Sequence, residues 1–186
     1  MARFTFSRLP ISGLILAERQ HTHDERGFFS RFFCADEFSA AGFDTPIAQI
    51  NQTFTRRKGA VRGLHFQHPP YAEVKVVSCL RGSIFDVAVD LRLGSPTFLR
   101  WHGEVLSASG GRSLLIPRGF AHGFQTLEEE CELLYLHSNP FASTAEGALN
   151  VSDPRLDIEW PLAPTDISAR DRAHPAIGSD FTGLPQ

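Results

Sequence analysis

The sequence predicts an all-β protein, a double-sheet jelly roll with short helical segments near its N- and C-terminal parts. Short runs with a period of two recur between turn signals about every ten residues, whereas helical periodicity is almost absent. The length of 186 residues suits one domain of ordinary size. A jelly roll of about eight strands fits this length and protects the sheet edges. We therefore predict a single domain over residues 1–186.

The expected strands are short runs of alternating apolar and polar residues. The clearest covers residues 83–91, where one face is wholly apolar and the other includes Asp86 and Asp90. In chain order the expected strands cover residues 27–33, 48–54, 60–67, 74–81, 83–91, 98–106, 112–117, 122–126 and 131–138.

Glycine and proline mark the turns between these strands, because Gly accepts positive φ and Pro fixes φ. Turn residues lie at 82, 94–96, 110–111 and 117–119, so antiparallel hairpins are expected. Only two segments, 36–42 and 168–173, have the pattern of short helices. Residues 176–186 lack any pattern, and we expect a loosely held tail there.

Composition and charge exclude several classes of protein. Apolar residues make up 42% and charged residues 21%, which argues against disorder and coiled coil. No apolar run reaches the roughly 20 residues of a membrane-spanning helix, so no membrane partner is expected. The net charge of −3 comes without a basic block, so no nucleic-acid partner is expected either. The start of the chain lacks a signal-peptide pattern and the three cysteines are scattered, which predicts a cytoplasmic protein with reduced thiols.

His65 and His122 are the histidines whose sequence context stands out. Alternation places His65 on one strand face with Val61, Gly63 and Gln67, where it is either a hydrogen-bonded structural residue or a functional group. His122 follows glycines and a proline at spacings that fit the second motif of the cupin jelly rolls.

A metal centre is not expected. Metal-binding cupins carry a His-x-His pair and a later Glu, because the cation needs several convergent ligands. Here the pair has become His65 and Gln67. Glu73 does not stand at the spacing at which the motif has its Glu. The pattern therefore resembles a cupin without its metal site.

Two further side chains in the predicted strands could carry chemistry. Tyr135 shares a face with Cys131, Leu133 and His137, and its phenol can give or take one proton. It could equally be an ordinary interior tyrosine bonded to the backbone. Lys75 is either a charge at the rim of the fold or a cation that stabilises a developing anion.

Several blocks in this order resemble the dTDP-4-dehydrorhamnose 3,5-epimerase family, from about Leu9 to Pro175. The blocks are RGLHFQ at 62–67, Lys75, FDVAVDLR at 85–92, GSPTF at 94–98, IPRGFAHGF at 116–124, LY at 134–135, DP at 153–154, IEWP at 158–161 and SARD at 168–171. The resemblance implies a cupin-type double-stranded β-helix. It also implies a homodimer that exchanges an N-terminal arm of about residues 1–35.

The resemblance also implies roles for individual residues. His65 corresponds to the catalytic base, Asp171 to the aspartate that orients it, Tyr135 to the proton donor and Lys75 to the cation beside the 4-keto oxygen. Arg26 and Phe29 correspond to part of a nucleotide-binding arm from the partner subunit. The other implied substrate-binding residues are Gln49, Asn51, Arg62, His122 and Phe141.

The implied function is epimerisation at C3, C5 or both of a nucleotide-linked 4-keto-6-deoxyhexose. The most favoured conversion is dTDP-4-dehydro-6-deoxy-D-glucose to dTDP-4-dehydro-L-rhamnose, an isomerase reaction of carbohydrate biosynthesis. The base removes a proton beside the ketone, and the acid returns one to the opposite face of the enolate. No cofactor is expected, because the 4-keto group itself makes the C–H acidic.

Two residues depart from the family pattern and leave the nucleotide base open. Arg31 stands where relatives commonly have Glu, and Phe141 stands where they have a second Tyr. The carbon that is inverted also stays open, as does the pathway that uses the product. The alternatives are a cupin 3,4-ketoisomerase of nucleotide sugars and a noncatalytic sugar- or metal-binding cupin.

Overall fold

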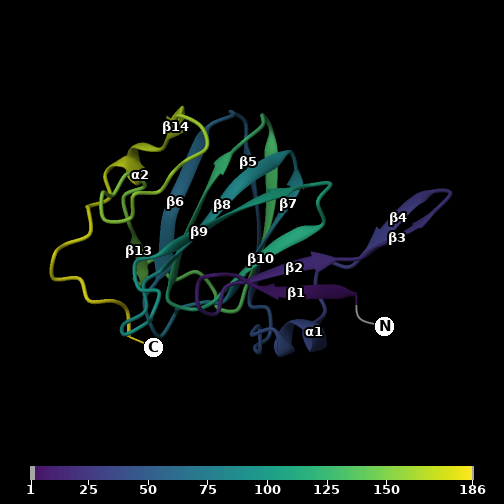
Figure 1. Cartoon of the computed structure of the whole chain (residues 1–186), viewed down its shortest axis with the longest axis horizontal. Helices are drawn as coiled ribbons and strands as arrows, with labels where there is room; N and C mark the ends of the chain where they lie inside the picture. Colours follow the sequence, from purple (N-terminus) through teal and green to yellow (C-terminus); the bar gives the residue numbers. More distant parts are fainter. Residues whose placement is uncertain (1–2, 186) are drawn as a thin grey trace.

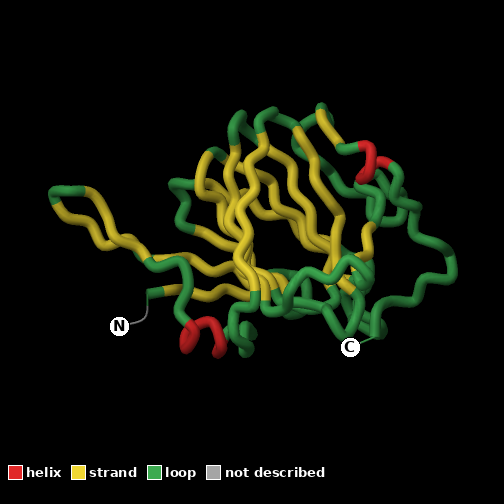
Figure 2. Tube along the Cα trace, turned by 180° about the vertical axis from the view of Figure 1, so that it is seen from behind, coloured by secondary structure: helices red, strands yellow, loops and turns green. Residues whose placement is uncertain are grey.

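Two β-sheets packed face to face form the body of the protein in this computed structural model, which describes residues 3–185. Two short helices, α1 (Ala35–Ala40) and α2 (Ala169–Arg172), lie at opposite ends of the sheets (Figure 1 and Figure 2). This arrangement confirms the predicted all-β fold with helical segments near both ends. Residues 1–2 of the predicted arm and residue 186 of the predicted tail lie outside the described residues.

The first sheet is antiparallel and has the strand order β1-β2-β10-β7-β12-β5. Its strands are β1 (Phe4–Arg8), β2 (Ile15–Arg19), β5 (Gln49–Thr55), β7 (Lys75–Arg81), β10 (Arg112–Ile116) and β12 (Cys131–His137).

The second sheet has the order β13-β6-β11-β8-β9, and the short β14 pairs in parallel with β6. Its strands are β6 (Ala60–Gln67), β8 (Ser83–Asp90), β9 (Trp101–Ser107), β11 (Phe120–Thr126), β13 (Glu146–Ala148) and β14 (Asp166–Ile167). A separate hairpin, β3 (His21–Asp24) and β4 (Gly27–Ser30), projects from the body (Figure 1). No helix within residues 3–185 is long and apolar enough to cross a membrane.

Most of the predicted strands are present, and the differences have local causes. Strands β1, β2, β3, β13 and β14 were not predicted, since each is short and most lie at an edge or outside the main sheets. Residues 98–99, expected to begin a strand, form a turn in which Leu99 has a φ of 58°. A β-strand cannot include that conformation.

Both faces of β8 are buried, each in a different apolar cluster. Ile84 and Ala88, which alternation places on one face of the strand, pack together between the two sheets. Val87 and Val89 pack on the outer side of the second sheet against residues of the C-terminal segment such as Leu156. The long connection after β13 therefore supplies the second cover that the outer face of β8 needs.

The C-terminal residues pack more closely than the expected loose tail. Ile177 and Leu184 are buried, and Leu184 forms a β-bridge with Arg92. Phe181 packs against the same outer cluster, and Leu184 exchanges backbone hydrogen bonds with Leu91 and Leu93. The apolar residues of this segment follow no periodic pattern, so the sequence did not indicate their packing.

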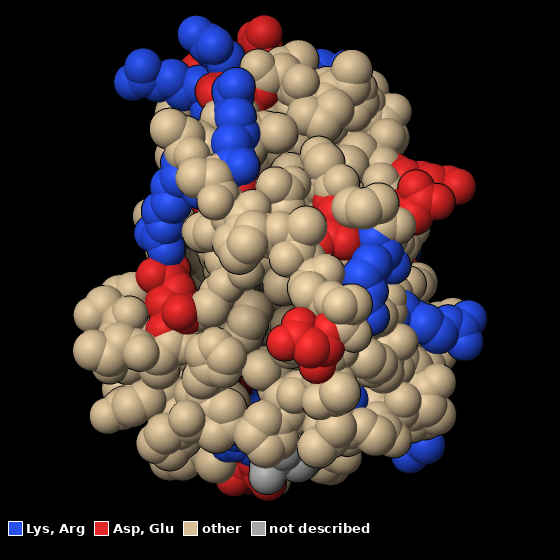
Figure 3. All heavy atoms as spheres, turned by 90° about the vertical axis from the view of Figure 1, so that its left-hand side faces the viewer, with Lys and Arg blue, Asp and Glu red and all other residues tan. Residues whose placement is uncertain are grey.

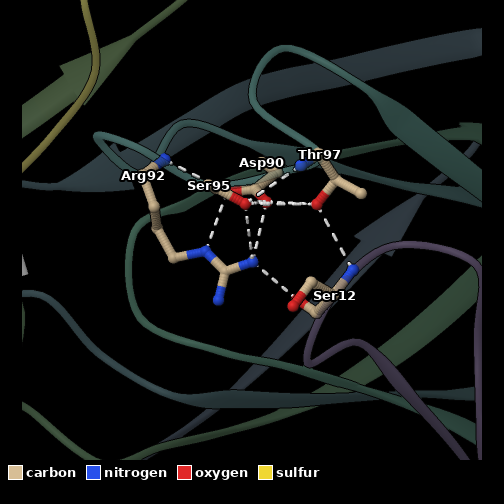
Figure 4. A network of polar contacts seen from close by, with 5 residues as sticks. All are labelled: Ser12, Asp90, Arg92, Ser95 and Thr97. Carbon is tan, nitrogen blue, oxygen red and sulfur yellow. Dashed lines mark hydrogen bonds and ion pairs between the residues drawn. The ribbon is translucent and has the colours of Figure 1, made fainter.

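A polar network centred on Asp90 ties the turn after β8 to the loop before β2 (Figure 4). The Asp90 carboxylate, which is fully buried, accepts hydrogen bonds from Arg92 Nη2 at 2.7 Å, Ser95 Oγ at 2.5 Å and Thr97 Oγ1 at 2.6 Å. Ser12 closes the network, because its carbonyl accepts from Arg92 and its amide donates to Thr97. Burial opposes ionisation of Asp90, but these hydrogen bonds outweigh burial and hold its pKa below the usual value.

Replacing Asp90 by Ala should lower the free energy of unfolding by about 3 kcal/mol, because it leaves the Arg92 guanidinium without its carboxylate. A group with a lowered folded-state pKa stabilises the fold above its unfolded pKa of about 3.9, and this contribution is lost as the pH falls through the folded value. Urea unfolding of wild type and Asp90→Ala at pH 7 and pH 3 measures both effects. The difference between the proteins should shrink at pH 3, and an equal difference at both pH values would contradict the assignment.

Candidate active site

A cavity of about 440 Å³ lies between the two sheets and is lined by side chains from both. The first sheet contributes through β5, β7 and β12, and the second through β6, β11 and β13. The lining residues are Gln49, Asn51, Thr53, Arg62, His65, Phe66, Gln67, Glu73, Lys75, His122, Phe124, Tyr135, His137, Asn139, Phe141 and Glu146.

The space between the sheets changes from apolar to polar along the strands. On β12, Leu133 belongs to the apolar core, and Tyr135 follows it two residues later on the same face. On β7, Val77 belongs to the same core and Lys75 lies two residues before it. Strand alternation therefore carries Tyr135 and Lys75 into the cavity.

The face prediction for β6 is wrong at its N-terminal half. Val61 packs in the outer cluster, whereas Arg62 lines the cavity with His65. The cause is a β-bulge: between the pairs His122–His65 and Phe124–Arg62, two residues of β6 face one residue of β11. Gly63 permits it, since its φ is 122° and a Cβ there would lie 2.6 Å from the Cα of Gly123.

His65 and Asp171 form a hydrogen-bonded pair. His65 Nε2 lies 2.9 Å from Asp171 Oδ1, and the Asp171 carboxylate is nearly buried behind the imidazole. Asp171 reaches this position from α2, where its main-chain N–H donates to Ser168 Oγ, the cap of the helix. Burial lowers the pKa of His65, although the Asp171 carboxylate partly opposes the change. His65 is therefore neutral at pH 7 and can accept a proton.

Tyr135 lies on the opposite sheet and keeps its proton. Its side chain is buried, and Thr53 Oγ1 donates a hydrogen bond to its hydroxyl oxygen at 3.4 Å. Burial raises the pKa of the phenol well above its usual value. The ring of His122 stands edge-on to Tyr135, and His122 Nε2 lies 2.7 Å from Asp86 Oδ1.

Lys75 forms a buried ion pair in the cavity wall. Its Nζ lies 2.9 Å from Glu73 Oε1, and Gln67 Nε2 donates to the other Glu73 oxygen at 3.0 Å. Burial opposes ionisation of Glu73, but Lys75 and Gln67 outweigh it and lower its pKa. His137 lies nearby, and burial together with the charge of Lys75 lowers its pKa to about 4. His137 is therefore neutral at pH 7.

Hydrogen bonds link Gln49 to Asn51 and to the backbone of Phe141 in the lining of the cavity. Gln49 Nε2 donates to Asn51 Oδ1 at 3.0 Å, and the Phe141 amide donates to Gln49 Oε1 at 2.9 Å. Phe141 lines the cavity and is 57% exposed, so its aromatic side chain is accessible there.

Most of the residues singled out from the sequence lie at this cavity. Arg26 and Phe29 do not: both are exposed on the β3–β4 hairpin, where Arg26 pairs with Asp24. The residues that do lie there are His65, Tyr135, Lys75, Gln49, Asn51, Arg62, His122 and Phe141 in its lining, with Asp171 bonded to His65.

The sequence reasoning missed several polar side chains of the cavity. Glu73 and His137 line the cavity two residues from Lys75 and Tyr135, so alternation from those two residues could have found them. Asp86 is not in the lining, but it lies behind it and contacts His122. His174, which contacts Asp171, carried no such signal because it follows α2 outside any strand.

Among residues 3–185, one group of three potential metal ligands converges: His65, Asp171 and His174, with donor atoms within 4.8 Å of one another. The 2.9 Å between His65 and Asp171 is shorter than the roughly 3.3 Å between neighbouring ligands of a tetrahedral zinc with bonds of about 2.0 Å. The distances fit a hydrogen-bonded pair with a third group beside it.

The surface beside this group is shown in Figure 3, the side of the molecule that carries α2. Lys and Arg lie at its upper left and along its two sides, acidic side chains are scattered between them, and its middle is mostly uncharged.

Inside the protein, a neutral imidazole on one sheet, a protonated phenol on the other and a lysine share one cavity. This set can take a proton from a carbon acid, stabilise the anion and return a proton.

Comparison with known proteins shows one family. The family model described as dTDP-4-dehydrorhamnose 3,5-epimerase matches residues 8–179. A dTDP-4-dehydrorhamnose 3,5-epimerase of Pseudomonas aeruginosa is 43% identical over 168 residues, which are 89% of this chain and 92% of that protein.

Solved structures agree with the family model. A dTDP-6-deoxy-D-glucose-3,5-epimerase of Legionella pneumophila in complex with dTDP-4-keto-L-rhamnose has a TM-score of 0.91 and 36% identity, covering 98% of this chain and 99% of that one. A 3′-monoepimerase of Streptomyces bikiniensis in complex with dTDP-quinovose has a TM-score of 0.85 and 33% identity, covering 96% and 91%.

Proposed function

Because this chain belongs to the dTDP-4-dehydrorhamnose 3,5-epimerase family, we propose that it inverts C3, C5 or both of a nucleotide-linked 4-keto-6-deoxyhexose. The favoured conversion is dTDP-4-dehydro-6-deoxy-D-glucose to dTDP-4-dehydro-L-rhamnose. The observation that carries the proposal is the cavity itself. His65, which is bonded to Asp171, lines it from one sheet, and Tyr135 and Lys75 line it from the other.

In the proposed mechanism His65 acts as the base. The Nε2–H of the imidazole donates a hydrogen bond to Asp171, which leaves the Nδ1 lone pair to accept a proton from the carbon beside the ketone. The C–H bond breaks, its electron pair becomes the enolate, and the ammonium of Lys75 stabilises the charge on the former keto oxygen. The phenol of Tyr135 then donates its proton to the opposite face of the same carbon.

Substrate binding in this proposal uses the rest of the cavity. Arg62 and His122 face the sugar and its phosphates, and Gln49 and Asn51 offer amides from the other wall. The exposed ring of Phe141 at the mouth suits stacking on the nucleotide base.

The homodimer is also part of the proposal. Arg26 and Phe29 lie on a hairpin that projects away from the body, and both are exposed within one chain. A second copy that accepted this arm would bring them to its own cavity, as the family resemblance implies. We also place the enzyme in the cytoplasm, where reducing conditions suit its three unpaired cysteines.

The pH dependence should follow from the base. Since the pKa of His65 is lowered, kcat/KM should fall only as the pH drops through a value below the usual 6.5, where the imidazole becomes protonated. The raised pKa of Tyr135 keeps the acid protonated through pH 9, so no fall from Tyr135 is expected there. A profile between pH 4.5 and 9 checks this, and an acid limb centred above pH 7 would contradict the assignment.

The substrate is tested with a panel of 4-keto-6-deoxyglucoses linked to dTDP, UDP, GDP or CDP. We expect inversion products by NMR and the highest kcat/KM with dTDP. A higher kcat/KM with another nucleotide would assign the base that Arg31 and Phe141 leave open. Movement of the keto group to C3 would make the protein a ketoisomerase, and no turnover of any member would overturn the proposed function.

A further inference from the structure

A second imidazole lies against the carboxylate that holds the proposed base. His174 Nε2 is 3.6 Å from Asp171 Oδ1, the same oxygen that His65 contacts at 2.9 Å. The two rings are edge to face, with centroids 5.9 Å apart and planes at 86°. The side chain of His174 is 17% exposed.

The nitrogen that points to Asp171 has no other partner. His174 Nε2 is buried and makes no hydrogen bond with any described residue. A buried polar nitrogen without a partner is costly, so its neighbour across 3.6 Å is the acceptor it can use. Hydrogen bonds in empty active sites are often long and shorten when substrate binds.

The backbone holds His174 in this place. Asn150, which follows β13, donates from Nδ2 to the His174 carbonyl at 3.0 Å. His174 lies three residues after Asp171 and follows Ala173, the C-cap of α2, so the short helix and its cap set the spacing between the imidazole and the carboxylate. The other Asp171 oxygen accepts from the Gly63 amide at 3.4 Å.

We propose that His174 is a positioning residue of the reaction proposed above: it shares Asp171 Oδ1 with His65 and so limits how strongly the carboxylate holds the protonated base. The inference rests on the proposed function for its catalytic meaning. A carboxylate oxygen can accept two donors, and a second N–H draws charge away from the first. The imidazolium of His65 is then stabilised less and gives up its proton more readily.

Other charges face His65, and they stay constant in variants of His174. Arg170 lowers the pKa of His65 and Glu146 raises it, and these two form an ion pair with each other across α2 and β13. The other polar groups beside His65 are His122, which pairs with it across β11 and β6, and Arg62 on its own strand. A change seen on replacing His174 alone therefore reports on the shared oxygen.

The test compares His174→Phe, which removes the donor, with His174→Gln, whose amide can still donate to Asp171. The control is His102→Phe, because His102 also lies beside a carboxylate, Glu104, but outside the cavity. In His174→Phe the acid limb of kcat/KM should move to higher pH by about 0.5 to 1 unit, the size of shift one hydrogen bond to a carboxylate supports. His174→Gln and the control should keep the wild-type midpoint. A lower kcat with an unmoved midpoint would mean a purely structural role and overturn the inference.

A second readout separates this inference from the proposed function. The titration of the His65 Cε1 proton by NMR needs no substrate and should shift upward in His174→Phe alone. If the wild-type protein turned over no sugar but this shift appeared, the pairing would stand and the proposed function would fall. If the His65 titration were the same in all four proteins, the inference would fall whatever the activity.

Discussion

Replacing His65 by Asn should lower kcat for epimerisation by about 10³-fold, within the range of 10² to 10⁴ that a general base contributes. Asn keeps a polar side chain in the cavity but cannot take a proton from carbon at neutral pH. Solvent exchange of the substrate C–H should fall with kcat, because no enolate forms without the base. The measurement is the rate of product formation under saturating substrate.

The matched control for this variant is His68→Asn, the same change three residues later at an exposed site outside the cavity lining. It should keep the wild-type rate. Circular dichroism of both variants checks that the sheets are intact. If His65→Asn kept more than about a tenth of the wild-type kcat, a contribution far below that of a general base, His65 would not be the base.

Replacing Tyr135 by Phe should separate proton removal from inversion. Phe keeps the ring against His122 and loses only the hydroxyl and its long contact with Thr53, so the fold should be preserved. Inversion should fall by about 10²-fold or more, since no acid remains on that side of the sugar. Exchange of the substrate C–H with solvent should persist, because His65 can still remove a proton and return one to the same face.

The control is Tyr71→Phe, because Tyr71 is the other tyrosine of the chain and lies on the surface, 42% exposed. Deuterium uptake into recovered substrate and conversion to product are followed in the same samples. Tyr71→Phe should match wild type in both. Equal loss of exchange and inversion in Tyr135→Phe would mean that the phenol does not act as the separate acid proposed here.

Strand alternation accounts for the side chains in the cavity wherever the strand ladders are regular. Tyr135 and Lys75 lie on the inner faces of β12 and β7, because both strands continue an apolar core into the polar end. On β6 the same argument failed for Val61 and Arg62, since the bulge after them reverses the alternation. A bulge depends on the partner strand, so one strand's pattern cannot reveal it.

Contacts between distant segments were beyond any local pattern. Asp171 reaches His65 from a sequence separation of 106 residues, and only the family resemblance identified it in advance. His174 had no sequence pattern to single it out. The packing of Ile177 and Leu184 was missed for the same physical reason. Apolar residues in an irregular segment show no hydrophobic periodicity that would predict their burial.

The most direct test of the central claim, that proton transfer through an enolate inverts the sugar in this cavity, is conversion of the 4-keto-6-deoxyhexose by the wild-type protein in D2O. Mass spectrometry and NMR of the product locate the deuterium. We predict solvent deuterium at every carbon whose configuration has changed, and none at C2. A product that is inverted at C3 or C5 but carries hydrogen from the substrate at that carbon would contradict the account.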